Sequence, residues 1–347
     1  MELTIDKTLS AFAKLGDHFL ENPIELQEVI ERASRENNWL NIENIEKSIK
    51  SLSTWLQIDS LKEWVNSYDF KRVYPIKIGL IFAGNLPLVG FHDLLCVLAA
   101  GLRADIKLSS DDQVLPKYVI QKLIQFEPLL QDQIQIVEKL KDFDGVIATG
   151  SNNSSRYFEY YFGKKPHIIR KNRNSIAVLN GQETPEQLHA LGHDIFDYFG
   201  MGCRNVSKIF VPENYDIAKF YEGIAQHDYV KQNFKYFNNY EFHKSIYLIN
   251  KVDHFDNGFL LVKKDENLAS PLSVIFMEYY ESFEKLESIL ENISDQIQCL
   301  VTEENLNVSI PKVAFGKSQE PRLMDYADRV DTMKFLKEVI EKTEASS

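Results

Sequence analysis

Cysteine is scarce in this sequence: three are present among 347 residues, at positions 96, 203 and 299. They are widely spaced and form no even-numbered disulfide framework, which indicates reduced thiols in a reducing compartment. We therefore expect a cytoplasmic protein. The scarcity also makes the setting of each thiol informative, since a thiol outside an apolar segment has to be explained.

Long apolar runs and a basic charge are also missing. No apolar stretch is long enough to span a bilayer, and the opening MELTIDKTLSAFAKLG has no basic segment followed by an apolar one, so we expect neither a membrane span nor a secretory signal. The formal net charge of −12 argues against nucleic acid as a partner, because nonspecific binding to phosphates needs a basic surface. Any anionic ligand must be held by a local site.

The residues that are present predict a two-lobed α/β protein. Hydrophobic residues make up 44% of the chain, enough for an ordinary core, and the length favours two lobes. Apolar residues recur at helical spacing in "LSAFAKLGDHFLE", "IELQEVIERASREN" and "IENIEKSIKSLSTWLQ", so the first seventy or so residues are predicted to be helical.

Strand and helix patterns alternate from Val73 onward. Strands are predicted at "IKIGLIFAG", "ADIKLSS", "QIQIVE", "GVIATGS", "HIIRK" and "SIAVLNG", and helices at "LVGFHDLLCVLAAG", "LPKYVIQKLIQF" and "NNSSRYFEYYFG". This alternation is typical of a doubly wound sheet with mainly parallel strands. A helix from Thr184 to Tyr198, a turn around Cys203 and a further α/β stretch to about Val330 predict a second lobe.

Five segments together resemble the LuxC-like acyl-CoA reductases, a branch of the aldehyde dehydrogenase superfamily. They are "AGNLPLVGF", "ADIKLSSDDQVLP", "ATGSNNSSRYFEYYFG", "GMGCRNVSKIFVP" and "EPRLMDYADRVDTMKFL". The resemblance covers about Val73 to Leu336 and implies an aldehyde-dehydrogenase-like fold of two doubly wound lobes. We expect a helical segment over 1–72 packed on a nicotinamide cofactor lobe over 73–182, a catalytic lobe over 183–336 and a tail over 337–347.

Cys203 is the predicted nucleophile. A thiolate attacks a thioester readily, and a covalent acyl-enzyme divides a difficult reduction into two easier steps. Gly200 and Gly202 allow a tight turn beside the sulfur. A lone cysteine is more often a small buried hydrophobe, a description that suits Cys96 and Cys299, but the resemblance places the catalytic cysteine of the family at Cys203.

Asn85 in "AGNLPL" is the predicted oxyanion donor. It matches the asparagine of the superfamily's Pro-Trp-Asn-Phe-Pro segment, although Ala83 and Gly84 replace the leading proline and tryptophan. A preorganised donor at the developing negative charge contributes a few kcal/mol, roughly. Without the resemblance, Asn85 reads as a turn residue.

Lys107, Ser109 and Ser110 in "DIKLSS" are predicted to contact the cofactor. The resemblance places a lysine that contacts the adenosine ribose or its phosphate at Lys107. Relatives that prefer NAD often carry a carboxylate just after it, where this chain has hydroxyls. Hydroxyls beside a lysine tolerate an additional phosphate better than a carboxylate does, which favours NADPH, with NADH as the alternative.

Thr149, Gly150 and Ser151 are the other cofactor candidates. They lie in "TGSNNSSRYF", which resembles the superfamily turn that opens a helix behind the cofactor pyrophosphate, and helix N-termini bind anions. Ser151 also reads as an ordinary helix cap.

Two segments depart from the superfamily pattern. The stretch "IIRKNRNSIAV" stands where hydrolytic aldehyde dehydrogenases carry a water-activating glutamate, and it holds no Glu or Asp. This absence favours acyl transfer and reduction over oxidation to the acid. In "ENLASPLSVIF", Asn267 stands where a glutamate near the nicotinamide ribose is expected, with Glu266 beside it, so either residue is a candidate for that contact.

Three basic side chains lie close to Cys203 in the sequence. His189 and His193 share a helix face, an arrangement that suits metal binding or tuning of the thiolate, although such a pair is more often structural or solvated. No third ligand follows at recognisable spacing, so we predict no metal site. Arg204 either lowers the pKa of the Cys203 thiol or points away from it.

These features predict a reductase that converts an acyl thioester, usually acyl-CoA, to an aldehyde with NADPH through a covalent acyl-cysteine. A CoA-acylating aldehyde dehydrogenase for short acyl chains fits the same residues. A noncatalytic acyl-carrying or scaffold protein of this fold is the alternative from another class. Superfamily members often assemble, but the sequence shows no clear oligomerisation hairpin, so a homo-oligomer stays an open expectation.

Overall fold

The computed structural model describes residues 2–150, 152–171 and 173–345. The chain divides into two compact units, the first formed by residues 1–172 and 322–347 and the second by residues 173–321. Within these described ranges, each unit contains one β-sheet. None of the helices in the described ranges combines the length and the apolar character needed to cross a bilayer.

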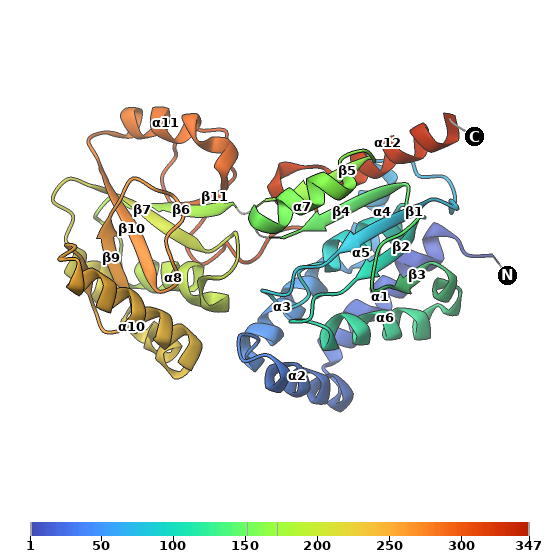
Figure 1. Ribbon diagram of the computed structural model, residues 1–347, viewed down its shortest axis with the longest axis horizontal. Coiled ribbons are helices and arrows are strands. Elements are labelled where there is room, and N and C mark those ends of the chain that lie inside the picture. Colours follow the sequence, from blue (N-terminus) through green and yellow to red (C-terminus); the bar gives the residue numbers. More distant parts are fainter. Residues whose placement is uncertain (1, 151, 172, 346–347) are drawn as a thin grey trace. The chain divides into compact units, whose positions relative to one another are not determined.

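The first unit surrounds a five-stranded sheet with helices (Figure 1). Its helices are α1 (Ile5–Glu21), α2 (Ile24–Glu36), α3 (Ile42–Trp55), α4 (Ile58–Asn66), α5 (Phe91–Ala99), α6 (Val114–Phe126), α7 (Asn152–Phe162) and α12 (Thr332–Ala345), with short 3-10 helices η1 (Pro128–Asp132) and η5 (Ala327–Arg329). Its strands are β1 (Lys77–Ile81), β2 (Arg103–Lys107), β3 (Ile134–Ile136), β4 (Gly145–Thr149) and β5 (His167–Arg170).

The strands of the first sheet run in the order β3-β2-β1-β4-β5, and every neighbouring pair is parallel. Leu80 of β1, for example, lies opposite Ile106 of β2 on one side and Ile147 of β4 on the other. The strand order reverses direction between β1 and β4, which is the point where doubly wound sheets bind ligands at their carboxyl edge. The predicted doubly wound architecture is confirmed for this unit.

The N-terminal helices share one hydrophobic core with the sheet-covering helices of the first unit. Phe12 of α1, Ile45 of α3 and Leu95 of α5 are all fully buried in it. The indole Nε1 of Trp64 in α4 donates a hydrogen bond to the hydroxyl of Tyr326 at 2.7 Å. The helical start of the chain is therefore part of this unit's core, and its burial of apolar surface contributes directly to the unit's stability.

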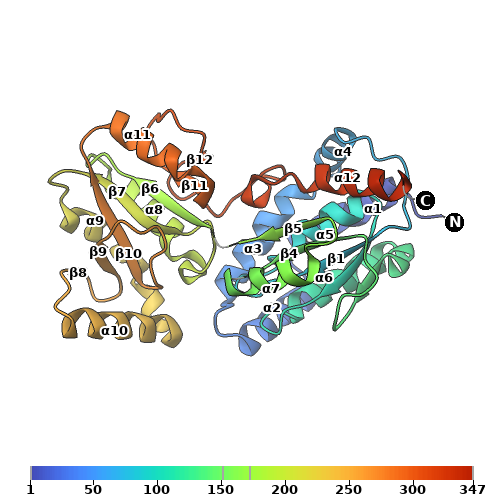
Figure 2. The same ribbon diagram turned by 45° about the horizontal axis from the view of Figure 1, so that its top comes forward.

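The second unit is built on a seven-stranded sheet of order β12-β11-β6-β7-β10-β9-β8. All neighbouring pairs are parallel except β8 with β9; Figure 2 shows β12 beside β11 and β8 beside β9. The strands are β6 (Asn174–Val178), β7 (Val206–Pro212), β8 (Phe255–Asp256), β9 (Leu261–Lys264), β10 (Val274–Tyr280), β11 (Ile297–Val301) and β12 (Lys312–Val313). The helices are α8 (Pro185–Phe196), α9 (Ile217–Gly223), α10 (Phe234–Ile249) and α11 (Phe283–Asn292), with 3-10 helices η2 (Asp197–Gly200), η3 (Ala225–Gln232) and η4 (Ser294–Gln296).

The structure differs from the predicted domain division at two places. The strand β6, expected within a cofactor lobe ending at residue 182, pairs with β7 and β11 in the second sheet. The segment 322–347, expected to end the catalytic lobe and form a tail from 337, returns to the first unit. There α12, red in Figure 1, runs to Ala345 and buries Met333 and Leu336 in the first unit's core. A periodic pattern predicts a strand or a helix, but it does not specify which sheet the element joins.

Candidate active site

The carboxyl edge of the first sheet gathers the predicted oxyanion and cofactor residues of that unit. Parallel strands place their carboxyl ends at one edge, and β1, β2 and β4 are neighbours there. Lys107 is the last residue of β2. Four other predicted residues lie in the loops just after the carboxyl ends of these strands: Asn85, Ser109, Ser110 and Gly150. Thr149 is the last residue of β4 itself, and Ser151 lies outside the described residues. Asn85, Lys107 and Ser110 are exposed.

The loops that follow β1 and β2 pack directly on each other. The amide of Phe82 donates to the carbonyl of Lys107 at 3.1 Å. A Cβ added to Gly84 would lie only 2.5 Å from Ser109 Oγ, so a larger residue at this position would push the two loops apart. The tryptophan that the superfamily carries before its asparagine therefore has no room at Gly84 in this packing, which gives a physical reason for that departure from the pattern.

Gly150, like Gly84, lies where there is no room for a side chain, between the end of β4 and the start of α7. A Cβ at this position would lie 2.9 Å from the side chains of Ser154 and Phe158. The first turn of α7 thus packs closely on the end of the strand. A helix N-terminus held this near a sheet edge presents backbone N–H groups to an anion.

A buried ion pair closes the end of β5. The guanidinium of Arg170 donates twice to Asp93 of α5, with Nη1···Oδ2 at 2.5 Å and Nη2···Oδ1 at 2.7 Å. Both side chains are more than 90% buried, and Arg170 also donates to the Thr332 hydroxyl at 3.2 Å. Sequence reasoning missed this pair, because "RKNR" reads as a run of surface charges. The stretch that was noted for its missing carboxylate therefore contributes a buried cation.

The predicted nucleophile lies between α8 and β7. Thr184 and Gln187 form a capping box that starts α8, with hydrogen bonds of 3.2 Å and 2.9 Å. The helix passes into η2, where Tyr198 and Phe199 both adopt left-handed backbone with φ of 54° and 56°. Such conformations cost about 1–3 kcal/mol each in residues other than glycine and persist only where the surroundings enforce them.

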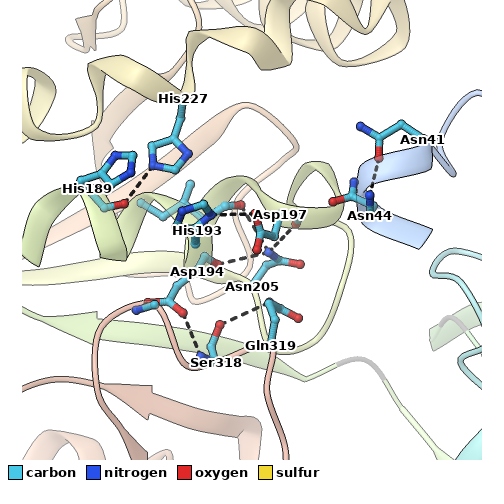
Figure 3. Close-up of polar contacts among 12 residues, drawn as sticks. Asn41, Asn44, His189, His193, Asp194, Asp197, Asn205, His227, Ser318 and Gln319 are labelled. Carbon is cyan, nitrogen blue, oxygen red and sulfur yellow. Dashed lines mark hydrogen bonds and ion pairs between the residues drawn. The ribbon is translucent and has the colours of Figure 1, made fainter. Parts of the chain in front are cut away.

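Asn205 holds this strained segment in place. It is 3% exposed, and its side-chain amide donates to the carbonyls of Asp197 at 2.8 Å and Asp194 at 3.1 Å (Figure 3). Its Oδ1 accepts from the amide of Gly202 at 2.8 Å. The carbonyls at the end of a helix lack intrahelical partners, so Asn205 stabilises the end of α8 and the glycine before Cys203 together. The sequence offered one signal for this role, an asparagine two residues after the cysteine.

Cys203 is the exposed thiol of this chain, whereas Cys96 and Cys299 are buried. The carbonyl of Cys203 accepts a hydrogen bond from Ser175 Oγ of β6 at 3.0 Å, which ties the turn to the second sheet. Burial raises the pKa of both Cys96 and Cys299, so these two thiols are poor nucleophiles. The predicted contrast between Cys203 and the other two cysteines agrees with their burial.

The side chain of Arg204 contacts the loop that follows β12. Its Nη1 donates to the carbonyl of Ser318 at 3.2 Å, and its charge acts on the Cys299 thiol, where it opposes the effect of burial on the pKa. Of the two alternatives for Arg204, these contacts favour a side chain turned to Ser318 and Cys299.

Glu266 and Asn267 both lie exposed after β9. The carbonyl of Glu266 accepts from Lys208 Nζ at 2.8 Å, and Asn267 donates to Asp265 Oδ1 from both its backbone and its side chain. These contacts shape the loop. Which of the two residues meets a cofactor stays a prediction.

A buried carboxylate connects α8 to the loop that follows β12. Asp194 is fully buried and accepts from the amides of Gly316 at 2.6 Å and Ser318 at 2.8 Å. Burial outweighs these hydrogen bonds and raises the pKa of Asp194 to about 6.

This shift predicts a pH-dependent stability. An unfolded aspartate has a pKa of about 3.9, so between about pH 4 and 6 the folded protein holds a proton that the unfolded chain has released. Asp194 therefore makes the free energy of unfolding fall as the pH rises through this window, by up to about 1.4 kcal/mol per pH unit. Urea unfolding at pH 4 and pH 6 should show that Asp194→Asn removes this part of the slope. Asp295→Asn, at an exposed acid of the same unit, should leave the slope as in the wild type, and equal slopes in all three proteins would contradict the prediction.

Comparison with known proteins places the chain in a family. The profile of the family described as Acyl-CoA reductase (LuxC) matches residues 12–227, which is more than half of the chain and includes Asn85, Lys107 and Cys203. This chain belongs to the LuxC acyl-CoA reductase family. The resemblance drawn from the five sequence segments is thereby confirmed. No curated protein matches the sequence.

Solved structures similar to this LuxC family member include aldehyde dehydrogenases. Aldehyde dehydrogenase 21 from Physcomitrella patens was solved with the reaction product succinate and has a TM-score of 0.67 at 12% identity. The alignment covers 97% of this chain and 85% of the chain of aldehyde dehydrogenase 21. The indole-3-acetaldehyde dehydrogenase AldA of P. syringae, solved with NAD+, has a TM-score of 0.67 at 10% identity, and the alignment covers 90% of this chain and 76% of the AldA chain. The aldehyde dehydrogenase KauB of Pseudomonas aeruginosa has a TM-score of 0.65 at 12% identity, and the alignment covers 86% of this chain and 72% of the KauB chain. These likenesses confirm the predicted aldehyde-dehydrogenase-like fold. Membership of the LuxC family indicates an oxidoreductase that acts on the acyl-CoA/aldehyde couple.

Proposed function

We propose that this protein is an NADPH-dependent acyl-CoA reductase that forms a covalent acyl intermediate on Cys203. The observation that carries the proposal is the setting of Cys203, an exposed thiol on a turn fastened by Asn205 and Ser175, while the other two thiols are buried. A strained and firmly held backbone beside an accessible nucleophile is the kind of arrangement that active sites use. Membership of the LuxC family supplies the substrate class.

The proposed reaction begins with attack of the Cys203 thiolate on the thioester carbonyl. The new carbon–sulfur bond forms as the carbonyl oxygen takes the negative charge, and when the carbonyl re-forms, the CoA thiolate leaves with the electrons of the broken bond. Asn85 and the backbone N–H of Cys203 are the proposed donors to the oxyanion. A bound reduced nicotinamide would supply the hydride to the acyl carbon. The carbon–sulfur bond to Cys203 would then break, which would release the aldehyde and return the electron pair to the Cys203 thiolate.

The lack of a carboxylate in residues 168–178 supports reduction rather than hydrolysis. A water molecule needs a nearby base to attack an acyl-enzyme at neutral pH. At the end of β5, this stretch instead carries Arg170, whose charge is neutralised by Asp93. Neither member of that pair is placed to act as a base, because both carboxylate oxygens of Asp93 already accept hydrogen bonds from the Arg170 guanidinium. The acyl-enzyme is therefore expected to survive until it is reduced.

Three features of the first unit support the proposed binding of a dinucleotide. The sheet order places the reversal point between β1 and β4, Gly150 permits close approach before α7, and Lys107 is an exposed cation at the end of β2. Lys107, Ser109 and Ser110 would hold the adenosine ribose and its phosphate, and Thr149, Gly150 and Ser151 the pyrophosphate. The hydroxyls next to Lys107 favour NADPH over NADH because they add no like charge.

Asn85 gives a sharp test of the oxyanion role. Asn85→Ala should lower kcat for acyl-CoA reduction by about 10²–10³-fold, the effect of removing one oxyanion donor, with little change in nucleotide binding. Steady-state kinetics and nucleotide titration would measure both effects. Asn66→Ala, at an exposed asparagine of the same unit, serves as the control, and an unchanged kcat in Asn85→Ala would leave Asn85 as a turn residue only.

The direct test of the function is an assay of the purified protein with acyl-CoA esters of several chain lengths and either NADPH or NADH. We expect loss of the reduced nicotinamide together with release of aldehyde, faster with NADPH. Acyl transfer to the protein without aldehyde would overturn the proposal in favour of an acyl-carrying protein. A preference for oxidising short aldehydes in the presence of CoA would favour the acylating dehydrogenase.

A further inference from the structure

Three histidine rings from two separate elements gather in the second unit (Figure 3). His189 and His193 lie one turn apart on α8, and η3 brings His227 to them. The ring centroids are 4.7 Å apart for His189 and His227, 4.8 Å for His193 and His227, and 5.4 Å for His189 and His193. One ring nitrogen from each lies within 4.8 Å of the others. The sequence contained the pair but gave no sign of the third member.

The hydrogen bonds of His227 determine which of its nitrogens can bind a ligand. Its Nε2 lies 2.9 Å from the carbonyl of His189, and because a carbonyl only accepts, Nε2 must carry the proton. In the neutral ring Nδ1 then holds a lone pair. His227 is 1% exposed, and this Nδ1 is buried with no hydrogen-bond partner in the described part of the chain. Burial lowers the pKa of His227 to about 4, so the ring is neutral under ordinary conditions.

His189 repeats this feature. Its Nδ1 is also buried without a hydrogen-bond partner among the described residues. Buried polar atoms are nearly always satisfied, and each exception calls for an explanation such as a missing ion. Here two such atoms belong to adjacent rings, and both are of a type that binds transition metals.

His193 has the support that metal-binding histidines usually have. Its Nδ1 lies 3.1 Å from Oδ1 of Asp197, a carboxylate that is almost fully buried. A carboxylate on one ring nitrogen orients the ring and makes the other nitrogen, Nε2, the metal ligand. The negative charge of Asp197 also offsets part of the charge of a bound cation.

We propose that His189, His193 and His227 form a binding site for a divalent transition metal of the zinc class, with Asp197 orienting His193. Imidazole nitrogens bind Zn²⁺ at about 2.0–2.1 Å, so the ligand atoms must close to about 3.3 Å from one another in tetrahedral geometry. The two α8 rings are only partly buried and can rotate to do so. A fourth position stays available to water.

A metal at this site would join three parts of the second unit. It would link α8 to η3. Because His193 contacts Asp197, the first residue of η2, it would also restrain this strained segment, which precedes Cys203. The backbone carbonyl of Asp197 also accepts a hydrogen bond from the side-chain amide of Asn205. Metal occupancy is therefore expected to reduce the mobility of the Cys203 turn. This site does not depend on the proposed acyl-CoA reduction, and its test needs no turnover.

The test is a titration of the full-length, metal-stripped protein with Zn²⁺ by calorimetry and with Co²⁺ by visible absorption. We expect saturation at one ion per chain, with Co²⁺ bands of a tetrahedral site and no thiolate-to-cobalt charge-transfer band. His189→Ala removes a ligand that is only partly buried and should weaken Zn²⁺ binding by more than about 100-fold. Asp197→Asn should weaken binding by about 10–100-fold, as the loss of an orienting carboxylate does.

Two controls make the outcome decisive. His167→Ala changes an exposed histidine of the first unit and should bind Zn²⁺ as the wild type does, and near-UV circular dichroism shows whether each variant stays folded. No saturable binding by the wild type, or equal affinity in folded His189→Ala, would overturn the proposal. A charge-transfer band that disappears in Cys203→Ala would overturn it as well, since the metal would then lie on the thiol.

Discussion

Replacing Cys203 by alanine should abolish acyl-CoA reduction, lowering turnover by at least about a thousandfold, while leaving nucleotide binding intact. Removal of a nucleophile eliminates the covalent route, and what remains is the small rate that binding and oxyanion donors support without it. Nucleotide binding should persist because the cofactor candidates lie in the first unit, whereas Cys203 lies in the second. The measurement is aldehyde formation from acyl-CoA beside a fluorescence titration with NADPH.

A matched control comes from the other two cysteines. Cys299→Ala removes a thiol that is fully buried in β11, so it should lower stability and retain turnover. Mass spectrometry of the wild type after a short incubation with labelled acyl-CoA should place the acyl group on Cys203. Ordinary turnover in Cys203→Ala, or an acyl group found on another residue, would refute the assignment of the nucleophile.

Asp93→Asn should destabilise the first unit by about 3–5 kcal/mol. The substitution leaves the Arg170 guanidinium buried without its counter-charge, which is far more costly than the net contribution of the pair itself. Arg170 is 7% exposed, so water cannot replace the lost carboxylate. Urea unfolding, followed by circular dichroism and by the tryptophan fluorescence of this unit, measures the loss.

An exposed arginine–carboxylate pair in the same unit provides the comparison. Arg72 and Glu344 are 2.6 Å apart with side chains 66% and 49% exposed, so Glu344→Gln should lower the stability far less than Asp93→Asn does. The double variant Asp93→Leu with Arg170→Met removes both charges and should recover most of the stability lost in Asp93→Asn. A loss in Asp93→Asn no larger than that in Glu344→Gln would contradict the role of burial.

In both sheets, the local sequence pattern predicts where strands form, but it does not predict which strands pair. The predicted strands of the first sheet all form within a few residues of their expected ends, because alternating apolar residues and bounding turns are properties of neighbouring residues. Parallel pairing joins segments that are far apart in sequence. β6 therefore looks like one more strand of the series, yet it lies between β11 and β7 in the other sheet.

The proposed functional residues divide in the same way. Cys203, Asn85 and Lys107 were proposed from motifs, whose residues are consecutive in the chain. Asp93 with Arg170, and His227 with the α8 pair, are separated by long stretches and share no motif. Their partnership arises from which element packs on which.

By itself, the sequence determined the order and type of the elements around the first sheet, the family, and the one cysteine that stands outside an apolar segment, because periodicity and motifs are local. Only the tertiary structure decided that α12 completes the first unit, that Arg170 is buried with Asp93, and that a third histidine joins the pair on α8. These are pairings between distant segments, and their free energy comes from burying groups together, which no single segment contains.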